Sequence, residues 1–288
     1  MTGKKGIYAV SAVALLAIGA VFGVLSWQVI RAGSGEASEE ISAPTLDIEA
    51  GPTFSQAQAE AFATENAELR MQIEVMVTES ANENATAIVT EESMGDVENQ
   101  TDSGKNLLYR ISQEGSEVRF NIDETLSGSR ITVVGVTDQV AGDIIIDFDN
   151  PSSSRLGVIR INVRTLRTDQ DFRNIALRSD ILESARDEYE FAEFHPVSIN
   201  SLPDTVAIGD DLVFQITGDL VVHGVTQAAT FETNITLVAE DRIEGYATAT
   251  ILYSDFNISI PSVPRVADVS DEVILEIDFV ATIVTDTE

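Results

Sequence analysis

The sequence contains no cysteine among its 288 residues. This absence excludes disulfide bonds, catalysis by a thiol and zinc sites built from thiolates. A folded part of the chain must therefore be stable through its hydrophobic core alone. A β domain of about 180 residues buries enough surface for that.

Basic residues are scarce, because 17 lysines and arginines stand against 48 aspartates and glutamates. The formal net charge is −31. Phosphate binding requires a basic surface, so the sequence predicts no nucleic acid partner. The same charge opposes close approach to anionic lipid head groups.

Histidine is nearly absent, and the two present are His195 and His223. An enzyme requires acid–base groups or a nucleophile within mutual reach. The chain has no G-x-S-x-G, H-E-x-x-H or phosphate-loop motif. We interpret His195 as a residue at the start of a strand and His223 as a turn residue. The sequence therefore predicts no catalytic residue, and a hydrolase or redox enzyme is the least favoured class.

Neighbouring acids offer the oxygen ligands that calcium prefers, but none has the spacing of the twelve-residue calcium loop. We interpret these acids as parts of solvated loops and predict neither a metal site nor a cofactor. The groups are Asp147/Asp149, Asp210/Asp211 and Asp268/Asp271/Glu272.

One long apolar run, residues 6–30, carries no charge. At about 1.5 Å per residue, a helix of this length crosses a hydrocarbon core of about 30 Å. Lys4 and Lys5 precede the run and should keep the N-terminus in the cytoplasm. Residues 1–31 are thus predicted to form a membrane anchor, with the remainder extracytoplasmic, in the periplasm or at the cell surface. A signal peptide cleaved near residues 32–35 is the alternative.

Residues 32–104 are acidic, and Arg70 is their only cation. Such a segment buries too little apolar surface to fold, so we predict a mostly disordered linker. Within it, residues 55–78 predict a short amphipathic helix, with a parallel coiled coil as the alternative. Gly19 and Gly23 would also let two anchors approach closely. These two features are the only hints of a homodimer.

From residue 105 onward the hydrophobic period becomes two, which predicts strands with one buried and one wet face. Phe231, Ile235 and Leu237, for example, alternate with Glu232, Asn234 and Thr236. Residues 168–182 break this pattern with helical spacing, and Thr168 or Asp169 could cap the short helix. Residues 105–288 are therefore predicted to form an all-β domain, an antiparallel up-and-down barrel with one inserted helix.

The segment TGDLVVHGVT at residues 217–226 is close to the motif G-x-L-T-I-x-G-V-T. This motif is typical of the YceI-like family of exported lipid- or polyisoprenoid-binding proteins, and several segments of the domain resemble that family. Ser116, Val118 and Phe120 match the start of the domain. The family's helix and following strand are matched by Arg173, Arg178, Leu182, Tyr189, Phe194 and Pro196. The resemblance covers residues 107–284.

The resemblance implies a lipocalin-like barrel that encloses a long apolar chain, such as a polyprenol or a quinone tail. Inward-facing residues would then line a cavity, although the same pattern also describes an ordinary filled core. The candidates are Phe120, Ile122, Ile161, Phe214, Ile216, Phe231, Ile235, Leu275 and Phe279. The alternative function is a cell-surface β domain with a filled core that contacts other proteins.

Two departures from the family pattern concern polar positions. Many members have a histidine shortly after the first strand's phenylalanine, whereas this chain has Ile122, Asp123 and Glu124 there. Val221 replaces the family's usual threonine. A polar contact made by that histidine is therefore not carried over to this chain.

Overall fold

The computed structural model describes residues 33–48 and 106–285. The predicted anchor with Gly19 and Gly23, and the predicted helix at 55–78, lie outside these residues. Within the two described stretches, no helix is long and apolar enough to cross a bilayer.

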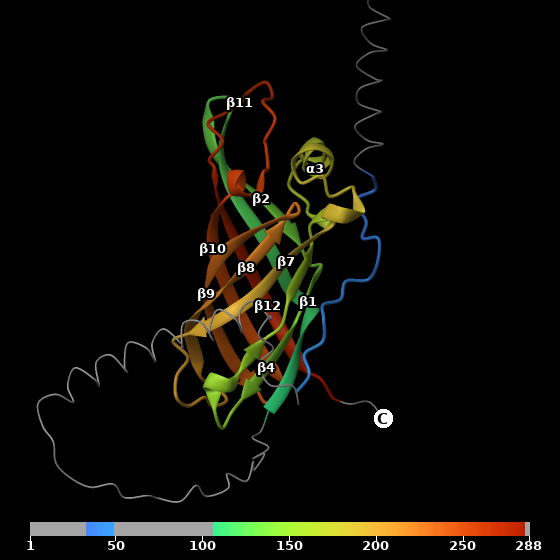
Figure 1. Ribbon diagram of the computed structural model, residues 1–288. Coiled ribbons are helices and arrows are strands. Elements are labelled where there is room, and N and C mark those ends of the chain that lie inside the picture. Colours follow the sequence, from blue (N-terminus) through green and yellow to red (C-terminus); the bar gives the residue numbers. More distant parts are fainter. Residues whose placement is uncertain (1–32, 49–105, 286–288) are drawn as a thin grey trace, which may run out of the picture. The chain divides into compact units, whose positions relative to one another are not determined.

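One antiparallel sheet of twelve strands makes up the folded domain (Figure 1). Every strand pair in it is antiparallel, which confirms the predicted all-β antiparallel class. The strands are β1 (Asn106–Leu126), β2 (Ser129–Thr137), β3 (Val140–Ala141), β4 (Asp143–Asp147), β5 (Arg155–Leu156), β6 (Ile159–Asn162), β7 (Phe191–Asn200), β8 (Asp211–Val222), β9 (Val225–Ala239), β10 (Arg242–Leu252), β11 (Val266–Ala267) and β12 (Glu272–Ile283).

The sheet curls back on itself at β1. Strand β1 pairs with β12 on one edge and with β2 and β4 on the other. Gly142 separates β3 from β4, and its carbonyl accepts a hydrogen bond of 2.9 Å from the Ile111 N–H. Since β3 also pairs with β6, the backbone pairing continues from β6 back to β1. The result is a barrel-like wall around a common interior.

A short helix interrupts the strands where the sequence predicted it. Helix α3 (Asp171–Ala176) continues into a wider turn, Leu177–Ile181. The predicted cap is wrong, because Gln170 precedes the first turn and no side chain caps it. The Thr168 hydroxyl instead donates to Asn174 Oδ1 at 2.8 Å, while Asp169 pairs with Arg173. Both side chains are therefore engaged away from the free N–H groups of the helix.

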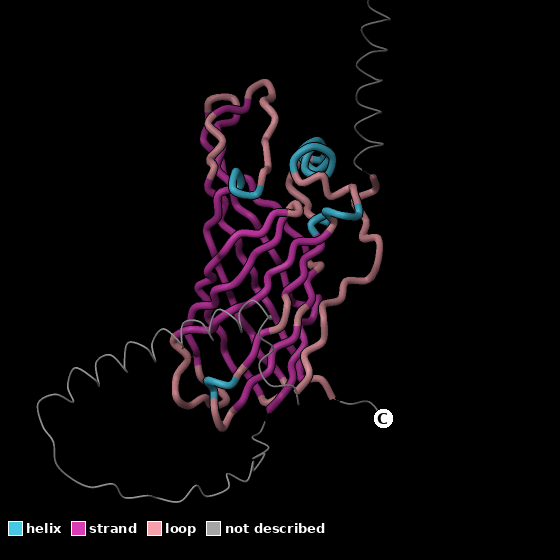
Figure 2. Tube along the Cα trace, viewed as in Figure 1, coloured by secondary structure: helices cyan, strands magenta, loops and turns pink. Residues whose placement is uncertain are grey.

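Short 3-10 turns complete the fold, and α3 lies at one end of the barrel (Figure 2). The turns are Pro151–Ser153, Val163–Thr165, Asp187–Tyr189 and Tyr253–Phe256. His223 and Gly224, with φ of 51° and 71°, form the predicted turn between β8 and β9. The prediction for His195 is wrong, since it lies in the middle of β7.

Residues 33–48, called the strap below, lie along the barrel wall, although the sequence predicts that they belong to the mostly disordered linker. The Ser38 N–H donates to Glu190 Oε1 at 2.8 Å, and the Leu46 N–H donates to Asp143 Oδ2 at 3.2 Å. Ile41 is buried. The acidic composition of the strap indicates disorder. The strap is nevertheless ordered because its hydrogen-bonding partners lie in the barrel, about a hundred or more residues away in the sequence.

Candidate binding cavity

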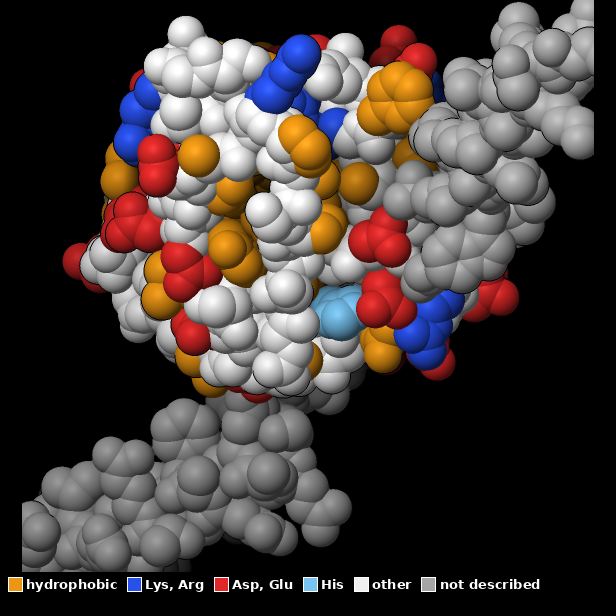
Figure 3. All heavy atoms as spheres, turned by 90° about the horizontal axis from the view of Figure 1, so that it is seen from above, with side chains coloured by type: hydrophobic (Ala, Val, Ile, Leu, Met, Phe, Trp, Pro, Cys, Tyr) orange, Lys and Arg blue, Asp and Glu red, His pale blue; other side chains and the backbone are white. Residues whose placement is uncertain are grey.

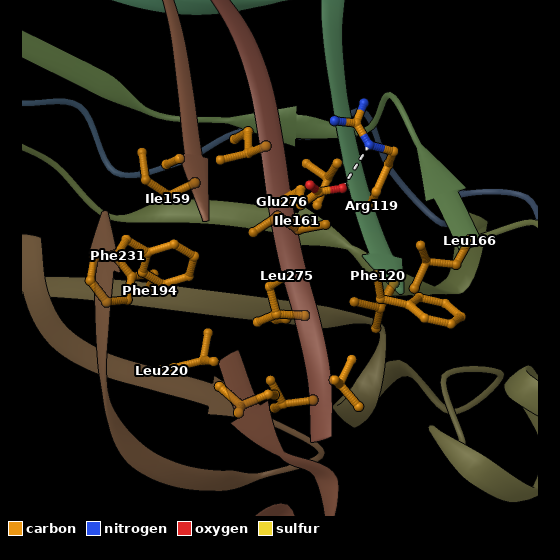
Figure 4. A pocket seen from close by; sticks show the side chains of 18 of the residues that line it. Arg119, Phe120, Ile159, Ile161, Leu166, Phe194, Leu220, Phe231, Leu275 and Glu276 are labelled. Atoms are coloured by element: carbon orange, nitrogen blue, oxygen red, sulfur yellow. Dashed lines mark hydrogen bonds and ion pairs between the residues drawn. The ribbon is translucent and has the colours of Figure 1, made fainter. Parts of the chain in front are cut away.

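The interior of the barrel holds a cavity of about 600 Å³ with a predominantly apolar lining. All nine residues proposed from the sequence lie in its wall. Figure 4 shows Phe120, Phe231 and Leu275 entering the cavity from different strands. The predicted alternative of a filled core is therefore wrong for this interior.

The alternating pattern places these side chains inside. On β8, Leu212, Phe214 and Ile216 are buried while Val213 and Gln215 are exposed. Because successive side chains of a strand point to opposite faces, one face of each strand supplies the wall of the cavity. Phe194 on β7 meets Phe231 on β9 edge-to-face, with ring centroids 4.9 Å apart.

Glycines on neighbouring strands leave room for two of the cavity's phenyl rings. Phe120 lies opposite Gly135, and Phe279 lies opposite Gly245. A Cβ atom at either glycine would overlap the facing ring. The rings can therefore lie against the wall, which leaves the middle of the cavity open.

A buried ion pair, Glu124–Arg173, lies in the cavity wall beside α3. Arg173 Nη2 is 3.2 Å from Glu124 Oε1, and the two side chains are only 17% and 10% exposed. Arg173 also pairs with Asp169, whose side chain is 73% exposed. The fork of a guanidinium has five N–H donors, so these two contacts leave donors for a further acceptor.

The sequence analysis did not single out this pair, although a signal was present. Phe120 and Ile122 point inward on β1, and the period of two puts Glu124 on the same face. An acid at an inward position is costly unless it is paired. That position alone therefore called for a cationic partner, but the sequence does not reveal that α3 supplies it.

The cavity opens at the end of the barrel that carries α3, called the mouth end below. Phe172 on α3 and Val263 in the loop before β11 line the cavity and are also 74% and 46% exposed. Figure 3 views this end and shows hydrophobic side chains around a hollow. A ligand can therefore enter between α3 and this loop.

The other candidate residues form no reactive site in the described parts of the chain. His195 Nε2 lies 3.1 Å from Glu193 Oε2, and the His223 ring packs against the Tyr189 ring at a tilt of 47°, with centroids 4.4 Å apart. Neither histidine lines the cavity. Within residues 33–48 and 106–285, no three acids or histidines gather as metal ligands would.

The fold and the cavity together define the class of this protein, which is an antiparallel barrel with an apolar internal cavity. A family model for the YceI-like domain matches residues 109–281, so the chain belongs to the YceI-like family. The resemblance noted in the sequence is thereby confirmed. No curated protein matches the chain significantly.

Solved structures with a similar fold come from three bacteria. A polyisoprenoid binding domain from Saccharophagus degradans, implicated in plant cell wall breakdown, has a TM-score of 0.50 at 17% identity and covers 62% of this chain and 99% of that one. Burkholderia cenocepacia BcnA has a TM-score of 0.47 at 18% identity, with coverage of 60% and 99%. A Campylobacter jejuni YceI protein gives 0.43 at 14% identity, with coverage of 72% and 96%. At 17% identity, the likeness to the Saccharophagus degradans domain concerns the fold alone.

Proposed function

We propose that the protein binds an isoprenoid-type lipid, such as a polyprenol or a prenylquinone, in the barrel cavity and catalyses no reaction. The observation that carries this proposal is the cavity of about 600 Å³ with its predominantly apolar wall. Ligand pockets in proteins measure about 300–1,000 Å³, so this cavity has a suitable size. Membership of the YceI-like family and the polyisoprenoid-binding neighbour support the same assignment.

The apolar wall suits a chain that needs little polar recognition. Burial of each CH₂ group contributes about 0.8 kcal/mol, so a prenyl tail gains most of its affinity from contact with the wall. The polar end of the ligand would lie at the Glu124–Arg173 pair. A quinone carbonyl would accept from Arg173, and an alcohol would donate to Glu124.

The proposal includes placement outside the cytoplasm, with residues 1–31 as a membrane anchor. Its support is the uncharged apolar run at residues 6–30, preceded by Lys4 and Lys5. The nine wall residues are proposed to contact the lipid chain. The anchor would keep the cavity near the bilayer in which such lipids dissolve.

Truncation of one wall residue tests the assignment of the cavity. In Phe214→Ala, we expect the affinity for a prenylquinone to fall by about tenfold or more, because a phenyl ring contributes about 1.5–3 kcal/mol on burial. Val213→Ala is the matched control, since Val213 is adjacent but 65% exposed on the outer face. Titration of both purified variants measures the effect, and equal affinities would contradict the assignment.

A further inference from the structure

The mouth end of the barrel exposes apolar side chains on both sides of the opening. Phe172 contributes from α3, and Pro261, Val263 and Pro264 contribute from the loop before β11. The three loop residues are exposed and line the cavity as well. These apolar side chains therefore extend from the lining of the cavity to the outside of the barrel.

The charge at this loop differs from that of the chain as a whole. Residues 256–267 contain no acid and one cation, Arg265, although the chain carries a net charge of −31. The α3 side carries the acids Asp169 and Asp171, which are both exposed. A surface of this kind suits an electrically neutral lipid layer better than an anionic one.

The strap fixes which end of the barrel lies near the predicted anchor. Gly35 lies against the Arg178 side chain, just beyond α3 at the mouth end. At the other end of the strap, the Ile48 carbonyl accepts a 3.1 Å hydrogen bond from Arg155 on β5. The strap therefore runs from the mouth end to the far end, where β4 and β5 lie.

The apolar run ends at Ile30, five residues before Gly35. A fully extended chain spans at most about 3.6 Å per residue, so these two residues lie within about 18 Å of each other. This distance leaves no room for a long spacer between a bilayer and the mouth end. The far end of the barrel would point away from that bilayer.

We infer that the mouth end rests on the bilayer that holds the anchor, with Phe172 and the Pro261–Val263–Pro264 loop in contact with a zwitterionic lipid surface. The lipid then passes between bilayer and cavity without crossing water. This inference rests on the proposed function, because it takes residues 6–30 as the anchor and a lipid as the ligand.

Tryptophan fluorescence in vesicles tests this orientation with the full chain. Trp27 is the only tryptophan, so Trp27→Phe provides a background for single probes. We would introduce Phe172→Trp or Val263→Trp and compare phosphatidylcholine vesicles with and without bromine on their acyl chains. Contact of these positions with the acyl region should reduce their fluorescence by about twofold in brominated vesicles.

The matched control is Ile208→Trp in the same background. Ile208 is 53% exposed and lies at the far end, where Gly209 bonds to the Leu237 carbonyl near the end of β9. We expect no quenching there. Equal quenching at positions 172, 263 and 208, or none at any of them, would overturn the docking.

Separate readouts distinguish failure of the docking from failure of the proposed lipid binding. The unaltered chain reports on the anchor through Trp27, and an unquenched Trp27 would overturn both the anchor and the docking. Quenched Trp27 with unquenched probes at 172 and 263 would overturn the docking alone. Quenching at 172 and 263, without a bound lipid when the full chain is analysed by native mass spectrometry, would support the docking and overturn lipid binding.

Discussion

Glu124 occupies an inward position of β1 and is compensated by Arg173 of α3. With Asp169 also paired to Arg173, two acids surround one cation at this point of the wall. An anionic head group would therefore meet net negative charge, whereas an alcohol or a quinone would find hydrogen-bonding partners. This balance favours neutral prenyl lipids over prenyl phosphates.

Glu124→Gln tests this preference because it keeps the shape of the side chain and removes its charge. Arg173 would then be balanced by Asp169 alone. We expect the affinity ratio of geranylgeranyl phosphate to geranylgeraniol to rise by about tenfold or more, since close charges interact by several kcal/mol at a protein surface. Titration of both ligands with the purified variant measures the ratio.

Glu244→Gln is the control for this experiment. It removes the same charge from the outer wall, where the Glu244 side chain is 50% exposed and pairs with Arg242. The ratio should stay at the value of the unaltered protein. If the two variants gave the same ratio, the head group would not reach Glu124.

Among the elements, the strap is fastened near its start by the buried carboxylate of Glu190. Glu190 is fully buried and accepts hydrogen bonds from Ser38 and from Asn162, at 2.8 Å for the latter. Arg164 Nη1 lies 3.0 Å from Glu190 Oε2. Burial raises the pKa of Glu190, but the Ser38 and Asn162 hydrogen bonds and the Arg164 charge outweigh it and hold the pKa below its usual 4.5.

A lowered pKa in the folded state means that Glu190 stabilises the fold above its ordinary pKa. That contribution is lost as the pH falls from about 4.5 through the lower pKa of the folded state. Glu190→Gln should therefore lower the free energy of unfolding by about 3 kcal/mol at pH 7, because it leaves a buried arginine less well paired. The difference between the two proteins should shrink below pH 4.5. Denaturant unfolding at several pH values measures it.

Hydrogen exchange shows whether Glu190 acts through the strap. Backbone amides of residues 33–48 should exchange faster in Glu190→Gln, while β8 and β9 keep their protection. The control is Glu188→Gln. The Glu188 side chain is 56% exposed and pairs with Arg186, so its replacement should change stability by less than about 1 kcal/mol. Unchanged exchange in the strap would contradict the role assigned to Glu190.

Local patterns predicted the strands and the helix well but failed for the strap. The alternation on β8 and β9 is a property of neighbouring residues, so the sequence displays it directly. The strap depends on contacts such as Ser38 with Glu190, which are 152 residues apart. Its acids and small residues carry no periodic pattern, and only the folded barrel provides its partners.

At the scale of the whole molecule, an apolar cavity lies inside a strongly acidic protein. The net charge of −31 keeps the outer surface of the protein well hydrated. Residues 256–267 at the mouth end contain no acid and are an exception to this acidic surface. The sequence predicted the nine wall residues because they alternate. It did not predict the cavity itself, since its volume depends on how far the sheet curls and on close approaches such as Phe120 to Gly135.

Native mass spectrometry of the full chain, purified gently from a bacterial membrane and followed by organic extraction, tests the central claim most directly. The account predicts a stoichiometric adduct that extracts as a prenyl lipid. An unliganded mass that stays unchanged after incubation with prenylquinones and polyprenols would contradict it.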